Sequence, residues 1–316
     1  MADTSRPTIL PADAAGIAEA AATLARGGLV ALPTETVYGL AARADSDDAV
    51  ASIYRAKGRP DFNPLIVHVA DVAAAEALAI LDDRAHRLAQ RFWPGPLTLV
   101  LPRRAGAPLA AAVTANLPTV AVRCPAHPAM RAVLLAVGLP LAAPSANRSG
   151  GVSPTTAAHV ATSLGVRVDL VLDGGACSAG LESTIVALRE DDTWQMLRPG
   201  PITQSEIAAV LGGTPEAVTS AAIEAPGQLA RHYAPGKPVR LNAVQAEVDE
   251  FHIGFGPVAG HASLSASGDL AEAAARLYAM LHHAAQSPFA RIAIAPIPAD
   301  DIGIAITDRL TRAAAG

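Results

Sequence analysis

The sequence contains few cysteines and few aromatic residues. Two of its 316 residues are cysteines, Cys124 and Cys177, and 3% are aromatic. The two cysteines are distant in the chain and match no spacing typical of a metal site. A disulfide scaffold and a zinc finger are therefore excluded, and we expect two reduced thiols.

Long apolar runs are also missing. No stretch of about 18 residues is free of charges and helix breakers, so a transmembrane helix is not expected. The first ten residues carry Asp3 and Arg6 and hold no apolar signal core. We expect a cytoplasmic protein with no membrane partner.

Lysine is nearly absent from the basic residues. Only two of the 24 are lysines, Lys57 and Lys237, and the net charge is −5. This overall charge argues against a general nucleic-acid-binding surface. The stretch 84–167 nonetheless holds nine arginines and no lysine, aspartate or glutamate. Such a local excess favours a positive cleft for phosphate or carboxylate ligands, although surface arginines that only aid solubility would also produce it.

The length and the apolar pattern predict two α/β domains. Hydrophobic residues make up 51% of the chain, which is enough for a large core. Helical patterns and short apolar strands alternate over 1–212 without a strict strand–helix–strand repeat, which predicts a twisted mixed sheet with flanking helices. Glycine and proline then mark a linker over 213–238, and a smaller α/β domain is predicted over 239–316.

Individual elements follow from local patterns. Alanine-rich apolar spacing predicts helices over 46–57, 72–81 and 83–92. Ser46 or Asp47 is expected near the N-cap of the first of these. A short apolar run predicts a strand over 97–101.

A hydroxyl-rich stretch follows one predicted strand, at a position where α/β proteins often bind ligands. Residues 32–40 include two threonines, a glutamate and a tyrosine between apolar residues. They could line a pocket for a small polar ligand, or they could form a strand end with a threonine-rich turn. The pattern alone favours neither interpretation.

Two cations flank a glycine directly after a predicted helix. Lys57 supplies a compact charge and Arg59 a planar fork, and together they could grip a triphosphate. They could also be a basic helix end that complements the helix dipole, an interpretation that the spacing alone slightly favours. His68 follows on a predicted strand, where a lone histidine is more often structural.

The loop 143–156 is rich in small and hydroxyl residues and precedes a predicted helix. Its N–H groups could bind an anion, or its serines and threonines could only cap the helix. It lacks the Gly-Lys-Ser/Thr ending of a P-loop. No paired-carboxylate, Ser-His-Asp or metal-ligand pattern is evident, which indicates chemistry by positioning and charge neutralisation, as in transfer at phosphorus.

Taken in order, these motifs resemble the threonylcarbamoyl-AMP synthase family in its long form, with a YrdC-like N-terminal domain. The resemblance covers nearly the whole chain and is weakest over 239–267. The main matching segments are PTETVYGL at 33–40, AKGRPDFNPLIVH at 56–68, FWPGPLTLVL at 92–101, VAVRCPAHP at 120–128, APSANRSGGVSPTT at 143–156, DGG at 173–175, ESTIV at 182–186, LRPG at 197–200 and RHYAP at 231–235.

The resemblance implies a nucleotidyltransferase. It would make L-threonylcarbamoyladenylate and pyrophosphate from L-threonine, bicarbonate and ATP. An N-carboxy-threonine would form first, and its carboxylate would attack the α-phosphorus of ATP. Mg²⁺ would travel with ATP, and no protein metal ligand is implied. The product would pass to a separate tRNA threonylcarbamoyl transferase complex, for N6-threonylcarbamoyladenosine at tRNA position 37.

The resemblance also implies site residues, of which Lys57 and Arg59 would be catalytic. The threonine side would consist of Thr36, His68, Arg123, Ala143 and Ser183. The ATP side would consist of Arg59, Asn63, Thr119, Ser145, Asn147, Ser153, Arg198 and Tyr233. Arg123 would grip the threonine carboxylate with two N–H groups. Tyr233, within the linker 213–238, would fold over the site as a lid.

Two rival functions come from other classes of protein. The nine arginines of 84–167 favour a module that binds double-stranded RNA or tRNA, but the net charge of −5 makes stable nucleic-acid binding doubtful. A carbamoyl transferase that matures a hydrogenase shares a related domain, but such proteins carry zinc-finger cysteines that this chain lacks.

Overall fold

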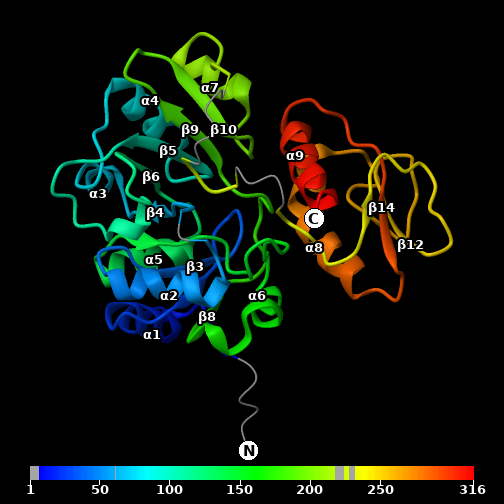
Figure 1. The fold of residues 1–316 in the computed structure, drawn as a ribbon, viewed down its shortest axis with the longest axis horizontal. Coiled ribbons are helices and arrows are strands. Elements are labelled where there is room, and N and C mark those ends of the chain that lie inside the picture. Colours follow the sequence, from blue (N-terminus) through cyan, green and yellow to red (C-terminus); the bar gives the residue numbers. More distant parts are fainter. Residues whose placement is uncertain (1–6, 61, 218–223, 228–231) are drawn as a thin grey trace, which may run out of the picture.

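The structure is a computed structural model that describes residues 7–60, 62–217, 224–227 and 232–316. Two separate sheets divide these residues into a larger and a smaller α/β part, as Figure 1 shows. The predicted linker 213–238 includes residues outside the described ranges, so the predicted domain boundaries stay predictions. Within the described residues, no helix has the length and apolar character needed to cross a bilayer.

A ten-stranded sheet forms the larger part. Its strand order is β1-β8-β2-β3-β7-β4-β6-β5-β9-β10, and it contains both parallel and antiparallel pairs. The predicted mixed sheet is therefore confirmed. The strands are β1 (Thr8–Pro11), β2 (Val30–Leu32), β3 (Gly39–Arg43), β4 (Ile66–His68), β5 (Leu97–Pro102), β6 (Thr119–Arg123), β7 (Leu141–Ala142), β8 (Leu170–Asp173), β9 (Thr184–Leu188) and β10 (Trp194–Arg198).

Helices cover both faces of this sheet (Figure 1). They are α1 (Ala14–Ala25), α2 (Asp47–Lys57), α3 (Val72–Glu76), α4 (Asp83–Phe92), α5 (Pro128–Val137), α6 (Ala157–Leu164) and α7 (Gln204–Leu211). Side chains alternate along β2: Val30 and Leu32 pack in the cluster that includes α1 and α5, whereas Ala31 packs in the cluster that includes α2 and α4. Period-two alternation thus fills two apolar layers.

The C-terminal end of helix α2 positions the two sequence-predicted cations, Lys57 and Arg59. The Ser46 side chain caps its N-terminus by accepting from the Ala49 N–H. Gly58 ends it with φ 62°, a left-handed conformation that glycine adopts at little cost. The chain therefore turns immediately after Lys57, and Arg59 leaves in a new direction.

Two local predictions were wrong in extent. A helix was predicted over 72–81, but α3 ends at Glu76, because Ala79 instead makes a strand-like bridge to Arg103. The local pattern also predicts no strand over 39–43, where the structure has β3. Long-range pairing overrides the local pattern in both cases.

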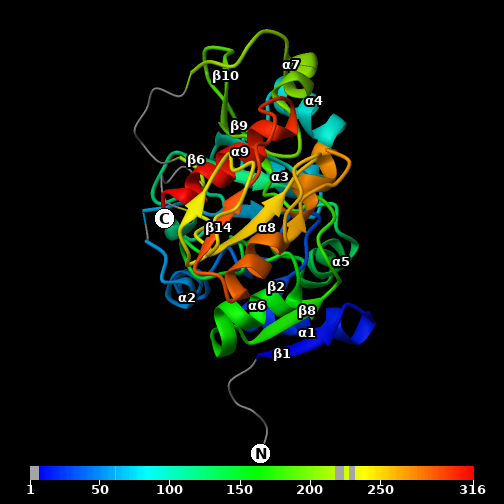
Figure 2. The ribbon, with the colours of Figure 1, turned by 90° about the vertical axis from the view of Figure 1, so that its right-hand side faces the viewer.

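The smaller part is built on a four-stranded parallel sheet of order β11-β14-β12-β13. Its strands are β11 (Val239–Arg240), β12 (Glu250–Gly254), β13 (Ala262–Ser263) and β14 (Arg291–Ile294), and its helices are α8 (Leu270–Gln286) and α9 (Ile302–Ala314). This confirms a smaller C-terminal α/β domain. The two helices lie between its sheet and the larger part (Figures 1 and 2). Their apolar cluster includes Val152 and Leu181 of the larger part, so the two parts share a core.

Candidate active site

A cavity lined mainly by polar and charged side chains lies where several strands of the larger sheet end. His68 ends β4, Arg123 ends β6 and Arg198 ends β10. Nine of the sequence-predicted site residues line it, namely Thr36, Arg59, His68, Arg123, Ala143, Ser145, Ser183, Arg198 and Tyr233. Residues from distant parts of the chain thus meet at one site.

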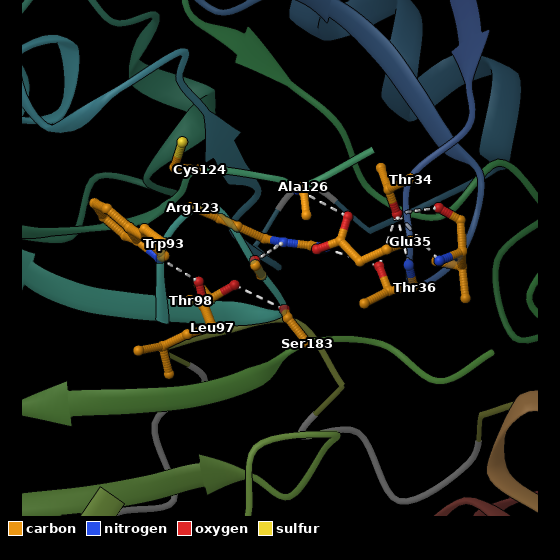
Figure 3. Close-up of polar contacts among 12 residues, drawn as sticks. Thr34, Glu35, Thr36, Trp93, Leu97, Thr98, Arg123, Cys124, Ala126 and Ser183 are labelled. Atoms are coloured by element: carbon orange, nitrogen blue, oxygen red, sulfur yellow. Dashed lines mark hydrogen bonds and ion pairs between the residues drawn. The ribbon is translucent and has the colours of Figure 1, made fainter. Parts of the chain in front are cut away.

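The threonine-rich stretch forms one wall of the cavity. Thr34 bonds the Thr36 hydroxyl at 2.8 Å and donates to the Val37 carbonyl, so both threonine side chains are fixed. Arg123 donates to Thr36 Oγ1 at 2.9 Å and to Glu35 Oε1 at 2.5 Å, as Figure 3 shows. This stretch is therefore a pocket wall rather than only a turn.

Arg123 is oriented by the protein and still has donors for a ligand. Its Nε donates to the Gly95 carbonyl, and one N–H of each terminal nitrogen serves Thr36 and Glu35. Among the contacts of the described residues, two of its five N–H hydrogens remain. Burial opposes the charge of Glu35, but Arg123 and the Ala126 N–H outweigh it and keep the pKa of Glu35 below its ordinary value.

Neutral polar groups complete this half of the cavity. Burial and then Arg123 lower the pKa of His68 to about 3, so its ring is neutral at pH 7. Ser183 Oγ lies 2.7 Å from Thr98 Oγ1 (Figure 3) and accepts from Arg198 at 3.1 Å. This half is suited to a small ligand with hydroxyl, amino and carboxylate groups.

Cations dominate the other half. Arg59 donates to the Asn63 and Pro64 carbonyls, and Arg198 donates to the Ser183 and Pro226 carbonyls. Within the described part of the chain, neither arginine pairs with a carboxylate. Burial lowers the pKa of Arg59 to about 10 and also lowers that of Arg198. Buried cations with only neutral partners favour an anionic ligand.

Lys57 lies behind the cavity wall rather than in it. Its side chain is 3% exposed, and Nζ donates to the carbonyls of Ser145 at 2.5 Å and Asn147 at 2.6 Å. Burial and then Arg59 lower the pKa of Lys57 well below its ordinary value. Lys57 therefore fixes the loop that carries Ser145.

Four predicted ATP-side residues do not line the cavity. Asn63 follows Arg59 in the chain, and Thr119 begins β6, at the opposite end of that strand from Arg123. The Asn147 amide donates to its own loop. Ser153 donates its hydroxyl to Glu182 at 2.5 Å. The geometry does not test their contact with a nucleotide, which stays a prediction.

The C-terminal end of the predicted linker contributes Tyr233. Its side chain is fully buried against Tyr278, with 5.5 Å between ring centroids. Pro226 and Gly227 also line the cavity. A Cβ added to Gly227 would lie 2.9 Å from Arg198 Cδ, so this position has no room for a side chain larger than that of glycine. The motif residue Arg231 lies outside the described residues, and the lid role of Tyr233 stays a prediction.

Buried polar atoms without a partner concentrate here. Within the described residues there are six such side-chain atoms, and five belong to residues in or beside the cavity. These five are Asn63 Oδ1, His68 Nδ1, Asn147 Oδ1, His232 Nδ1 and Tyr233 Oη. Orphaned buried groups are costly, so their clustering indicates a ligand site.

Sequence reasoning missed Glu35, Glu182 and His232. Glu182 and His232 line the cavity, and Glu35 holds Arg123. All three stand next to predicted site residues, which was the available signal. Of the nine arginines in 84–167, Arg123 is the one that lines the cavity. Within the described residues, no group of three or more His, Cys, Asp or Glu could hold a metal ion.

Comparison with known proteins matches both parts of the chain. A family model described as "Telomere recombination" (Sua5, YciO and YrdC) matches residues 22–200, and one described as "Threonylcarbamoyl-AMP synthase, C-terminal domain" matches residues 202–315. The chain belongs to the threonylcarbamoyl-AMP synthase family. The threonylcarbamoyl-AMP synthase of Bacillus subtilis is 41% identical over 326 residues, which cover 95% of this chain and 93% of that protein.

Other members of the threonylcarbamoyl-AMP synthase family agree in sequence and fold. The Schizosaccharomyces pombe synthase is 39% identical, over 79% of this chain and 69% of that protein. The crystal structure of Pyrococcus abyssi Sua5 complexed with L-threonine superimposes with a TM-score of 0.88 at 36% identity, and covers 97% of both chains. The family resemblance read from the motifs is therefore confirmed.

Proposed function

We propose that this chain is a threonylcarbamoyl-AMP synthase, a nucleotidyltransferase that converts L-threonine, bicarbonate and ATP to L-threonylcarbamoyladenylate and pyrophosphate. The observation that carries the proposal is the division of one cavity into two chemically different halves. Arg123 and buried hydroxyls suit an amino acid. Arg59 and Arg198, which pair with no carboxylate among the described residues, suit a polyphosphate.

The threonine half binds and orients the first substrate. We expect the two remaining N–H groups of Arg123 to hold the threonine carboxylate, because Glu35 and Thr36 fix the guanidinium plane. Neutral His68 and Ser183 offer hydrogen bonds to the amino and hydroxyl groups. The amine and bicarbonate give a carbamate with loss of water.

The cationic half then supports transfer at phosphorus. A carbamate oxygen forms a bond to the α-phosphorus of ATP, and the bond to the β-phosphate breaks, with its electron pair leaving on pyrophosphate. Arg59, Arg198 and the Lys57-supported loop neutralise charge that develops on the phosphates. Mg²⁺ arrives as part of the ATP substrate.

The decisive experiment measures pyrophosphate release with ATP·Mg, threonine and bicarbonate, and with each omitted in turn. We expect release that requires both threonine and bicarbonate. Release that does not depend on threonine would rule the proposal out.

The product is a mixed anhydride, which must be used by an enzyme that transfers the acyl group. We expect that acceptor to be the adenosine at tRNA position 37, modified by a separate threonylcarbamoyl transferase complex in the cytoplasm. Filter binding of tRNA to this chain should show no salt-resistant complex. Tight binding would instead favour the RNA-binding interpretation.

A further inference from the structure

Glu182 is a charged residue of the cavity that the proposed reaction does not use. Its Oε1 accepts from Ser153 Oγ at 2.5 Å, and its Oε2 accepts from Tyr278 Oη at 2.7 Å and Arg309 Nε at 3.0 Å. Tyr278 lies on α8 and Arg309 on α9. A carboxylate in the wall of the cavity is thus held by the C-terminal domain.

Arg309 is the most connected of these partners. Its side chain is 0% exposed. Besides Glu182, it donates to the Pro199 carbonyl at 2.9 Å and to Asp308 at 2.7 Å. Its guanidinium carbon lies 5.5 Å from the centre of the Tyr233 ring. One side chain therefore touches the Glu182 loop, the turn after Arg198 and the aromatic residue of the linker.

The loop that carries Glu182 is also pressed directly against α8. Gly180 has φ +68°, and a Cβ there would lie 2.3 Å from the Ala275 carbonyl oxygen. His282, one turn after Tyr278 on α8, bonds the Ser153 carbonyl at 3.1 Å. The C-terminal domain therefore holds Ser153 through both its carbonyl and, by way of Glu182, its hydroxyl.

The charge of Glu182 makes this contact important for an anionic ligand. Burial raises the pKa of Glu182, but Arg309 and Arg198 outweigh burial and bring it to about 2, so the group is ionised at pH 7. The same carboxylate acts electrostatically on Lys57 and Arg198. Without Arg309, the negative charge of Glu182 would repel a triphosphate. It would also attract Lys57 and Arg198 and so weaken their attraction for the phosphates.

We propose that Arg309 is a positioning residue for nucleotide binding, through which the C-terminal domain neutralises Glu182 and leaves the Arg59 and Arg198 cluster free to bind ATP. This inference rests on the proposed function for the identity of the anion. It gives the C-terminal domain a specific part in the site, although none of its residues needs to touch the substrates.

The test compares Arg309→Met with Glu182→Gln and with the double variant, using calorimetric titration of ATP·Mg and steady-state KM values. In Arg309→Met, we expect the Kd for ATP to rise about tenfold or more, because an uncompensated charge then faces the nucleotide. Threonine KM should change much less. Adding Glu182→Gln should restore most of the ATP affinity.

A pH series separates this role from simple support of the fold. In Arg309→Met, Glu182 loses the charge that keeps its pKa low, so ATP should bind more tightly as falling pH protonates it. The wild type and the double variant should lack this trend from pH 8 to 6. The other groups around Glu182 are Ser153, Tyr278, Lys57, Arg198, His232 and Tyr233; His232, with a pKa of about 3, stays neutral there.

Two further variants keep the inference falsifiable if Arg309→Met folds poorly. Tyr278→Phe removes one hydrogen bond to Glu182 and should weaken ATP binding in the same direction by a smaller factor. Arg276→Met removes an exposed ion pair on the same helix and should leave the Kd unchanged.

The outcomes are distinguishable from failure of the proposed function. Wild-type protein that binds ATP but releases no pyrophosphate would defeat the proposed function alone, because the affinity comparison still stands. Equal ATP affinity in Arg309→Met and wild type would overturn the inference. So would equal losses for ATP and threonine that Glu182→Gln does not restore, or a wild type that does not bind ATP.

Discussion

Lys57 Nζ lies 2.6 Å from the backbone carbonyl oxygen of Asn147, a residue 90 positions later in the chain. Together with the bond to Ser145, this contact ties the end of α2 to the hydroxyl-rich loop. A basic residue that could have been a helix-end charge is instead a loop anchor.

Lys57→Ala should therefore lower turnover by about 100-fold or more while the protein stays folded, because the loop that carries Ser145 loses its anchor. Pyrophosphate release and circular dichroism would measure the two effects. Lys237→Ala is the matched control, since Lys237 also donates to two carbonyls, at the end of α8. It should cost less than about 2 kcal/mol of stability and leave turnover intact. Normal turnover in Lys57→Ala would refute the role.

Arg59→Met should weaken the binding of ATP and leave the binding of threonine nearly unchanged. Arg59 makes no carboxylate pair within the described chain, so its charge is available to phosphates. We expect the KM for ATP to rise about 10- to 100-fold and the KM for threonine to change less than about threefold. Equal changes in both constants would contradict the division of the cavity.

Arg123→Lys should have the opposite selectivity. Lysine has no planar fork, so it cannot serve Thr36, Glu35 and a carboxylate ligand together. The KM for threonine should rise about tenfold or more, with little change for ATP. An Arg123→Lys enzyme with wild-type threonine KM would exclude Arg123 as the carboxylate-binding group.

The interface between the two parts should weaken in acid. The rings of His159 on α6 and His282 on α8 stack with centroids 3.9 Å apart. Burial and then His282 lower the pKa of His159 to about 4, and burial lowers that of His282. Below about pH 6.5 these two histidines bind protons in the unfolded chain but stay neutral in the folded protein. The folding stability present above that pH is therefore lost as pH falls toward 4.

Urea denaturation between pH 7 and 4 would measure this loss, which should be smaller in His159→Phe, where a ring can still stack. His86→Phe is a control of opposite sign. The hydrogen bond to Glu76 raises the pKa of His86, so His86 stabilises the folded state in acid. Removing the His86 ring should therefore make the loss of stability between pH 7 and 4 no smaller. An unchanged slope in His159→Phe would contradict the assignment.

The accuracy of sequence reasoning differed between neighbouring segments. The helix predicted over 83–92 is α4, because a strong apolar stripe and an Asp82 cap agree with each other. The helix predicted over 72–81 was too long, because Ala79 is taken up by a bridge to Arg103 from elsewhere in the chain. Local patterns succeed where no distant partner competes for the backbone.

The sequence by itself determined the fold class, the family and half of the residues that line the cavity, since these depend on apolar periodicity and on contiguous motifs. Tertiary structure alone decided which groups are paired. Glu35 accepts a hydrogen bond from Arg123, and Lys57 donates to backbone carbonyls. Glu182 accepts from Arg309, which lies 127 residues later in the chain. Charge compensation depends on distances between segments far apart in the chain, and no local pattern encodes those distances.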